Sequence, residues 1–266
     1  MASNDSFQQF LDTKQYCMKG VRRYEWIFGK TFLSAGGFAT TQKYVSQLHL
    51  KPGQKVLNVG CGIGGHSFYM AEEFGVEVLG VEISINMMTI ATEYLSEKKH
   101  LDSKVKFVLC DITKSIFDDD SFDAIYTRDT LIHIADKEKL FAKFQRWLKP
   151  GGKILFTDYT KSDKELSHNF NKYINDRMYT LLTTKEYKEL LEKAGFVNIR
   201  VMDSTKEFLD ALHVELMKLR GEKQNFLKEF SEEDSQCLEE NWAWKIRRVA
   251  EGKQTWTTCY AEKAVN

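Results

Sequence analysis

The sequence predicts an α/β fold, a mostly parallel seven-stranded sheet with helices on both faces. Apolar, β-rich runs alternate with helical patterns along the chain, as in parallel sheets whose crossovers are helices. Both prolines stand in Lys-Pro-Gly turns, at Lys51–Gly53 and Lys149–Gly151, just before two of these runs. A glycine-rich turn, Gly60–Gly65, joins one run to a helical pattern. These observations indicate a Rossmann-like architecture.

The strands are predicted from runs that are rich in branched and aromatic residues. The Lys-Pro-Gly turns introduce the first and the fifth run, and the second to fourth read as further buried strands. The pattern changes after Tyr159, but two later runs keep strand character. The expected strands are Lys55–Val59, Glu77–Glu82, Val105–Leu109, Phe122–Arg128, Lys153–Tyr159, Val197–Met202 and Gln254–Glu262.

Helices are predicted between these runs from apolar residues at helical spacing. Thr183 and Glu186 resemble a capping box that opens a helix, and Gly195 is placed to end it. The expected helices are Gly64–Glu73, Ile85–Glu97, Asp136–Leu148, Thr183–Ala194, Ser204–Arg220 and Glu232–Val249.

The domain organisation predicted is one domain over residues 1–266. No internal repeat or linker interrupts the chain. We divide it into an N-terminal helical lid (1–45), a cofactor-binding core (51–160), a helical cap insertion over the site (161–183) and a C-terminal part of the sheet and helices (184–266).

Composition narrows the class of ligand. Lys plus Arg number 38 and Asp plus Glu also number 38, so the formal net charge is zero and nothing attracts nucleic acid or an anionic membrane at long range. The five cysteines are scattered without a Cys-x-x-Cys pair, which argues against disulfides and a metal site. The polar start and the absence of long apolar runs predict neither a signal peptide nor a membrane span. We expect a cytoplasmic, monomeric enzyme that acts on a small molecule.

The glycine turn predicts a site for a cofactor that contains adenosine. Glycines let the backbone approach a ligand closely, and the N-terminus of the following helix offers free N–H groups. Glu82 ends the second predicted strand, where an acid grips a ribose diol in nucleotide-binding folds. Gly60, Gly62 and Glu82 are therefore candidate cofactor-binding residues.

Two classes of enzyme share this opening, nicotinamide oxidoreductases and S-adenosylmethionine-dependent methyltransferases. A dinucleotide site has the spacing G-x-G-x-x-G, whereas Gly60, Gly62 and Gly64 are evenly spaced, which favours a methyltransferase. Asp111 follows the third strand and is placed either to accept a hydrogen bond from an adenine amino group or only to cap a turn.

The fourth predicted strand carries a second group of polar residues. Arg128, Asp129 and His133 lie at and just beyond its carboxyl end, the edge that faces the ligand in open α/β sheets. From position alone, His133 is either a chemical group or a satisfied core histidine.

Several further motifs resemble the phosphoethanolamine N-methyltransferase family of class I S-adenosylmethionine-dependent methyltransferases, nearly from end to end. The resemblance implies stepwise N-methylation of phosphoethanolamine, its monomethyl form or its dimethyl form toward phosphocholine, which feeds phosphatidylcholine synthesis. It rests on Gln15-Tyr16, Tyr24–Gly29, Ser34–Gly37, Arg128-Asp129 with His133, Thr157–Tyr159, and Tyr173, Arg177 and Tyr179–Leu181.

The resemblance also implies roles for single residues. It implies catalysis by His133 as proton acceptor, with Tyr16 hydrogen-bonded to it and Asp129 orienting the amine. Arg and Lys charges and tyrosine hydroxyls suit a phosphomonoester, although the spacing of Tyr173, Arg177 and Tyr179 would otherwise indicate an ordinary amphipathic helix. The implied cofactor residues are Tyr24, Ser34, Gly60, Glu82, Ile83, Asp111, Ile112 and Arg128, and the implied phosphate residues are Tyr159, Tyr173, Arg177, Tyr179 and Lys245.

The sequence departs from the family at Asn58, where the family usually has Asp. The lost charge is expected to weaken or alter binding of the cationic cofactor. Glu82 in place of Asp keeps the carboxylate. The alternatives are a methyltransferase for another small amine or a carbon nucleophile, a nicotinamide oxidoreductase, and a non-catalytic cofactor-binding module.

Overall fold

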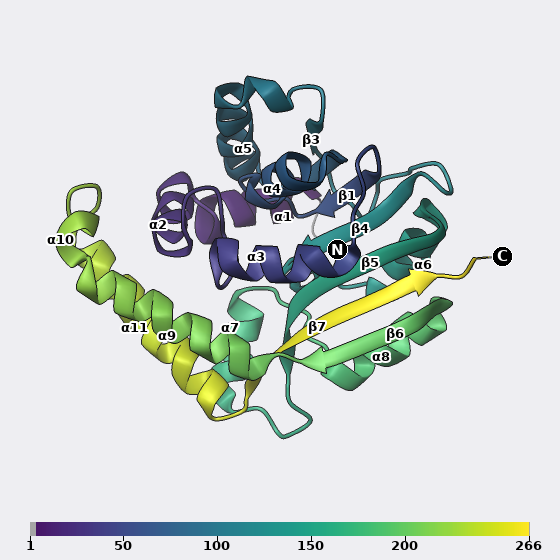
Figure 1. Ribbon diagram of the computed structural model, residues 1–266. Helices are drawn as coiled ribbons and strands as arrows, with labels where there is room; N and C mark the ends of the chain where they lie inside the picture. The colour runs from purple at the N-terminus through teal and green to yellow at the C-terminus, as the bar shows by residue number, and fades with distance from the viewer. Residues whose placement is uncertain (1–3, 266) are drawn as a thin grey trace.

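The computed structural model describes residues 4–265, so residues 1–3 and 266 of the predicted domain lie outside the described residues. The described chain forms one seven-stranded sheet in the order β3-β2-β1-β4-β5-β7-β6 (Figure 1). Strand β7 runs antiparallel to both of its neighbours, and the other pairs are parallel. The predicted mostly parallel α/β fold is confirmed. The strands are β1 Lys55–Val59, β2 Glu77–Glu82, β3 Val105–Leu109, β4 Phe122–Arg128, β5 Leu148–Lys161, β6 Phe196–Asp203 and β7 Gln254–Lys263.

The strand register brings the ends of the parallel strands to one edge of the sheet. Val59 is paired with Val81 on one side and with Thr127 on the other, and Arg128 is paired with Thr157. Strands β2 and β3 lie on one side of β1 and β4 on the other, so the loops after β1 and β4 diverge. A crevice at such a switch point is where open α/β sheets bind ligands.

The helices around the sheet form close to their predicted bounds. The capping box also forms, since the Thr183 hydroxyl accepts from the Glu186 N–H at 3.1 Å and the Glu186 carboxylate accepts from the Thr183 N–H at 2.6 Å. In the predicted cap only nine residues become helical, as α7. The helices are α1 Asn4–Phe10, α2 Met18–Phe28, α3 Gly37–Val45, α4 Gly65–Phe74, α5 Ile85–Glu97, α6 Lys137–Trp147, α7 His168–Asp176, α8 Thr184–Lys193, α9 Thr205–Gly221, α10 Lys223–Phe226 and α11 Glu232–Ala250.

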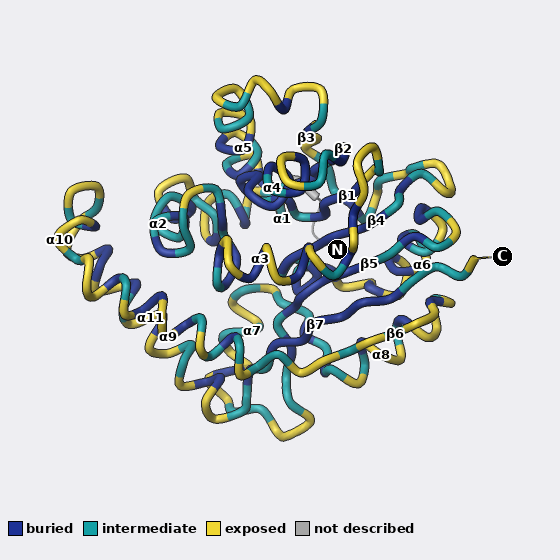
Figure 2. The backbone as a smooth tube through the Cα atoms, viewed as in Figure 1, coloured by how far each residue is buried: buried dark blue, intermediate teal, exposed yellow. Residues whose placement is uncertain are grey.

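Two large apolar cores cover the two faces of the sheet. One core joins strand residues to α3, α4, α9 and α11, and the other joins strand residues to α6 and α8. Figure 2 shows the central strands buried and the outer surfaces of the long α9–α11 pair exposed. Tyr44 and Val45 of α3 are completely enclosed in the first core. The segment 1–45 is thus not uniform, because α3 is part of the main core and the residues before Cys17 are not.

The helices of the described chain include none that is long and apolar enough to cross a membrane.

Candidate functional site

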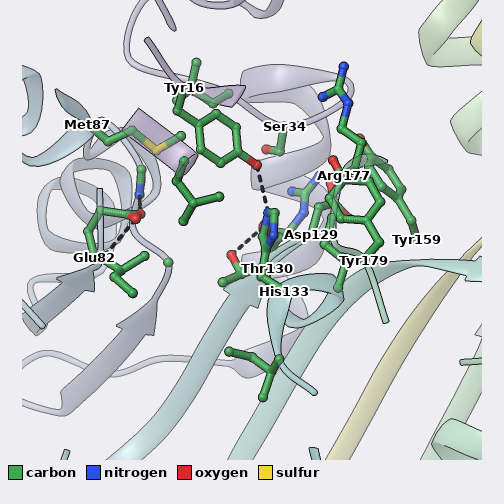
Figure 3. A pocket seen from close by; sticks show the side chains of 18 of the residues that line it. Tyr16, Ser34, Glu82, Met87, Asp129, Thr130, His133, Tyr159, Arg177 and Tyr179 are labelled. Atoms are coloured by element: carbon green, nitrogen blue, oxygen red, sulfur yellow. Dashed lines mark hydrogen bonds between the residues drawn. The ribbon is translucent and has the colours of Figure 1, made fainter. Parts of the chain in front are cut away.

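A cavity of about 950 Å³ opens at the carboxyl edge of the sheet. Its walls come from the N-terminal helices, the loops after β1 to β4, the end of β5, α7 and α11. Figure 3 shows Glu82 on one side, Arg177, Tyr159 and Tyr179 on the other, and Tyr16 and His133 between them. The residues named from the sequence that lie on these walls are Tyr16, Tyr24, Ser34, Gly60, Gly62, Glu82, Ile83, Asp111, Ile112, Arg128, Asp129, His133, Tyr159, Tyr173, Arg177, Tyr179 and Lys245.

The glycine turn after β1 packs so closely against its neighbours that it leaves no room for side chains at Gly60 and Gly65. Gly60 has a φ of +65°, and a Cβ atom there would lie 2.1 Å from the Thr130 hydroxyl oxygen. A Cβ atom on Gly65, the first residue of α4, would lie 2.4 Å from the carbonyl oxygen of Thr31. The turn is thus packed tightly on both sides, and its residues Gly60 and Gly62 line the cavity just before α4 begins.

Glu82 is held in place at the end of β2 by the backbone around it. Its carboxylate accepts from the N–H groups of Gly62 at 3.0 Å, Ile83 at 2.9 Å and Ser84 at 3.0 Å. Burial raises the pKa of Glu82, and these hydrogen bonds oppose that rise. A carboxylate has about four acceptor positions, so Glu82 retains one for a hydroxyl in the cavity.

Asp111 supports a turn and also lines the cavity. Its Oδ1 accepts from the N–H of Thr113 at 2.8 Å and from the Thr113 hydroxyl at 2.7 Å. Asp111 therefore caps a turn, which was one of the two roles predicted for it. Its position on the cavity wall keeps it in reach of a ligand.

Arg128 connects the sheet to the start of α3. The buried guanidinium donates to the Thr157 hydroxyl at 2.8 Å, the carbonyl oxygen of Ala35 at 3.2 Å and the Thr40 hydroxyl at 3.2 Å. It thereby braces the loop that carries Ser34, whose hydroxyl lies 3.1 Å from Nε2 of His66. Burial keeps the pKa of His66 well below its usual value, so this partner of Ser34 is neutral.

Asn58 lies behind the cavity, outside the residues that line it. It is completely buried in β1, and its amide nitrogen donates to the Ser67 hydroxyl of α4 at 2.9 Å. Its Oδ1 has no hydrogen-bond partner among the described residues. A charge at this position could therefore act on the cofactor only from a distance. The direct effect of residue 58 is on the contact between β1 and α4.

Tyr16 and His133 form a pair in the middle of the cavity. The Tyr16 hydroxyl lies 2.9 Å from Nε2 of His133, and the rings meet edge to face (Figure 3). Burial, with smaller contributions from Lys137 and Arg177, lowers the pKa of His133 to about 3. Burial also raises the pKa of Tyr16. Both groups are therefore neutral near pH 7.

The two carboxylate oxygens of Asp129 differ in their hydrogen bonding. Its backbone adopts a left-handed φ of +52° directly after β4. Oδ1 accepts from the Thr157 hydroxyl at 2.9 Å and from Nε1 of Trp256 at 2.7 Å. Oδ2 is buried and has no partner among the described residues, so it is the acceptor left for a cation in the cavity.

The far end of the cavity combines tyrosines with cations. Arg177 caps the C-terminus of α7, and the left-handed Met178 turns the chain so that Tyr179 returns to the same wall. Tyr179 is fixed by Nε2 of Gln15, which donates to its hydroxyl at 2.7 Å. Neither Arg177 nor Lys245 has a carboxylate within 4.0 Å among the described residues, although both line the cavity. This turn explains why helical spacing alone could not relate Tyr173, Arg177 and Tyr179.

The sequence analysis missed one more cation on this wall, Arg248. It is buried and lies one turn of α11 beyond Lys245. The spacing of Lys245 and Arg248, three residues apart, was a signal that they share a helix face. Its neighbours Trp242 and Trp244 also line the cavity.

Comparisons with known proteins place the chain in a family. The family model described as "Methyltransferase domain" matches residues 50–195. Phosphoethanolamine N-methyltransferase 1 of Arabidopsis thaliana is 44% identical over 98% of this chain and 53% of its own length. Phosphoethanolamine N-methyltransferase of Plasmodium falciparum is 36% identical over 95% of this chain and 94% of its own. The chain thus spans about half the length of the plant relative and nearly all of the Plasmodium one.

A solved structure agrees with these matches. It is phosphoethanolamine N-methyltransferase 2 of Haemonchus contortus in complex with phosphomonomethylethanolamine and S-adenosylhomocysteine, with a TM-score of 0.94 and 36% identity over 97% of this chain and 60% of its own. The preference for a methyltransferase over a nicotinamide oxidoreductase, drawn from the glycine spacing, is confirmed. The chain belongs to the phosphoethanolamine N-methyltransferase family.

Proposed function

We propose that this protein transfers methyl groups from S-adenosylmethionine to the nitrogen of phosphoethanolamine, or of its mono- and dimethyl forms, toward phosphocholine. The observation that carries the proposal is the order of groups along one cavity (Figure 3). The glycine turn and Glu82 lie at one side. Cations that have no carboxylate partner among the described residues lie at the other, and Tyr16, His133 and Asp129 lie between. A small zwitterion with an amine at one end and a phosphate at the other matches that order.

The residues around the glycine turn suit the cofactor. Glu82 would hold the ribose hydroxyls, and Asp111 with Ile112 would border the adenine. Ser34, Tyr24 and Arg128 would face the amino-acid part. S-Adenosylmethionine supplies an electrophilic methyl group on a sulfonium, and the chain's own residues must deliver a neutral amine to it.

His133 is the proton acceptor in this mechanism. The substrate ammonium would lose a proton to the imidazole, which leaves a nitrogen lone pair free to attack the methyl carbon. The bond from that carbon to the sulfonium sulfur would break, and its electron pair would stay on sulfur. In the free protein Arg177 contributes to the low pKa of His133. A phosphate dianion beside Arg177 offsets that charge, so binding of the correct substrate raises the pKa of its own base.

Asp129 and Tyr16 orient the reacting groups. Oδ2 of Asp129 accepts from the ammonium and stabilises the positive charge that the nitrogen regains when it is methylated. Tyr16 holds the His133 ring in place through the 2.9 Å contact. The rest of catalysis is positioning in a cavity that excludes water, an effect worth roughly 7–11 kcal/mol in well-oriented reactions.

The test is to incubate the protein with S-adenosylmethionine and, separately, with phosphoethanolamine, its mono- and dimethyl forms, ethanolamine and glycine. Mass spectrometry of the products reads out which methylation steps occur. Turnover of ethanolamine or glycine at the rate of the phosphorylated amines would favour another small amine as substrate. Cofactor binding without turnover of any amine would favour a non-catalytic module.

The phosphate end is tested separately with Arg177→Gln. Removing this unpaired cation is expected to raise KM for the phosphorylated amine roughly 10- to 100-fold, because a hydrogen bond to a charged group is lost. Affinity for S-adenosylhomocysteine is expected to change little. An unchanged KM would mean that the phosphate is bound elsewhere. The monomeric state and cytoplasmic location stay predictions.

A further inference from the structure

The C-terminal half of α11 presents one face to the cavity. Asn241, Trp244, Lys245 and Arg248 line it at the helical spacing i, i+3, i+4, i+7. Arg247, the neighbour of Arg248, is exposed on another face of the same helix. Arg248 itself retains only 6% of its surface exposed. A buried arginine that faces a cavity needs a physical reason, because burying a charge without a partner is costly.

No carboxylate supplies that reason. We call Arg177, Lys245 and Arg248 the cation cluster. Among the described residues none of the three has an Asp or Glu oxygen within 4.0 Å. The charge of Glu215 raises the pKa of Lys245 against the effect of burial. The hydrogen bonds of the Glu215 carboxylate, however, come from the N–H of Gly36 at 2.7 Å and from Nε1 of Trp242 at 2.9 Å. Positive charge is therefore in excess at this end of the cavity.

Two aromatic rings contact the guanidinium group of Arg248. Its guanidinium carbon lies 4.1 Å from the ring centre of Tyr173 and 4.9 Å from that of Trp244. Its Nε donates to Oε1 of Gln254 at 3.2 Å. A guanidinium has five N–H donors, and stacking leaves those on its edge free to point sideways. The two terminal nitrogens have no hydrogen-bond acceptor among the described residues.

Tyr173 links Arg248 to the rest of the cation cluster. The guanidinium carbon of Arg177 lies 5.4 Å from the same ring centre. Lys245, Arg177 and Arg248 together lower the pKa of the Tyr173 hydroxyl against the effect of its burial. Both guanidinium groups thus contact the Tyr173 ring, and all three members of the cation cluster line the same cavity.

From this geometry we propose that Arg248 is a third cation of the phosphate site and that the cation cluster selects a doubly charged phosphomonoester over a singly charged ester of the same shape. The inference rests on the proposed function, since it concerns the anionic end of that substrate. Two cations would suffice for a monoanion, whereas three aromatic-framed cations match a group that carries two negative charges and three acceptor oxygens.

The experiment compares two ligands that differ by one charge. The phosphate group of phosphocholine carries two negative charges at pH 8, whereas the sulfate group of choline O-sulfate has nearly the same shape and carries one. Their dissociation constants are measured by calorimetry in the presence of S-adenosylhomocysteine. The variants are Arg248→Gln and Arg248→Lys, and Arg247→Gln is the matched control because it removes the same charge from the exposed neighbour.

Arg248→Gln is expected to weaken phosphocholine roughly 10- to 100-fold and choline O-sulfate by clearly less, so that the preference between them falls. Arg248→Lys keeps the charge and is expected to retain most of the preference, which also keeps the test open if the glutamine variant does not fold. Arg247→Gln is expected to leave both constants unchanged, and S-adenosylhomocysteine affinity is expected to be the same in all variants.

Three results would overturn the inference. Equal loss of both ligands in Arg248→Gln would mean that Arg248 only supports the wall. Unchanged dissociation constants for both ligands in Arg248→Gln, with phosphocholine binding lost in Arg177→Gln, would exclude Arg248 from the phosphate site while leaving the proposed function intact. Failure of the unmodified protein to bind phosphocholine at all would refute the proposed function itself, and the inference with it.

Discussion

The contacts that join the segment carrying Tyr16 to the turn after Glu82 can be tested at Asp12. We call residues 4–16 the N-terminal segment. Asp12 Oδ1 accepts from the Ser84 hydroxyl at 2.5 Å, and Oδ2 accepts from the N–H of Ile85, the first residue of α5, at 3.1 Å. Asn86 donates from its side chain to the carbonyl oxygens of Asp12 at 3.0 Å and Tyr16 at 2.9 Å. The N-terminal segment is thus fastened to the turn that follows Glu82.

Asp12→Ala removes three carboxylate contacts, to the Ser84 hydroxyl, to the Ile85 N–H and to the Asn86 N–H at 3.4 Å, and a negative charge from the N-terminus of α5. Hydrogen bonds to a charged group contribute about 1.5–3 kcal/mol, and an anion at a helix N-terminus adds about 0.3–1 kcal/mol. We take about 2–3 kcal/mol for the loss of docking, which corresponds to roughly a 30- to 150-fold change in the ratio of docked to undocked N-terminal segment. Asp12→Asn keeps the shape and is expected to lose about 1 kcal/mol.

Amide hydrogen exchange of the peptide 7–16 measures this ratio directly, because exchange of a locally opening segment follows the population of its open form. Exchange of this peptide is expected to accelerate by roughly 30- to 150-fold in Asp12→Ala and by less in Asp12→Asn. Thr13→Ala is the control, since Thr13 is exposed and its hydroxyl only donates to the Gln9 carbonyl of the same segment. Equal exchange in Asp12→Ala and Thr13→Ala would refute the reasoning, as would a loss of protection throughout the sheet.

Three further predictions concern the cavity and the strand behind it. Tyr16→Phe keeps the ring but leaves Nε2 of His133 without its partner, which costs about 1–3 kcal/mol. The value of kcat is therefore expected to fall roughly 5- to 150-fold, with S-adenosylhomocysteine affinity unchanged. A wild-type kcat would show that the contact makes no contribution to catalysis. His133 has a pKa of about 3 in the folded protein against 6.5 unfolded, so the unfolded chain binds the extra proton and stability is lost as pH falls from 6.5 toward 3. Urea unfolding at pH 7 and pH 5 is expected to show a smaller loss in His133→Gln, and an equal loss would contradict the low pKa. Asn58→Asp puts a carboxylate in a fully buried position that offers it one hydroxyl, so Tm is expected to fall, and an unchanged cofactor affinity would remove the predicted role of charge at this position.

The sequence by itself determined the sheet, most of its helices and the cofactor side of the site. Those features depend on short-range patterns, because apolar alternation, a capping box and a glycine turn act over a few neighbouring residues. The loops after β1 and β2 then follow from topology, since parallel strands end at one edge of the sheet. Gly60 and Glu82 could therefore be assigned to one site from local patterns and strand order alone.

Only the tertiary structure decided the cationic end of the cavity and the contacts that hold Asp129 in place. Met178 reverses the chain after α7, and α11 comes from the far end of the sequence to bring Arg248 beside Tyr173. Trp256 of β7 fixes one oxygen of Asp129, and no local pattern relates these two residues. Such contacts depend on how elements that are distant in the sequence pack together. The free energy that keeps a cation buried without a carboxylate partner comes from the packing of all the residues that surround it. For that reason the sequence alone indicates only that Arg248 lies on a helix, and the tertiary structure is needed to show that it lines the cavity.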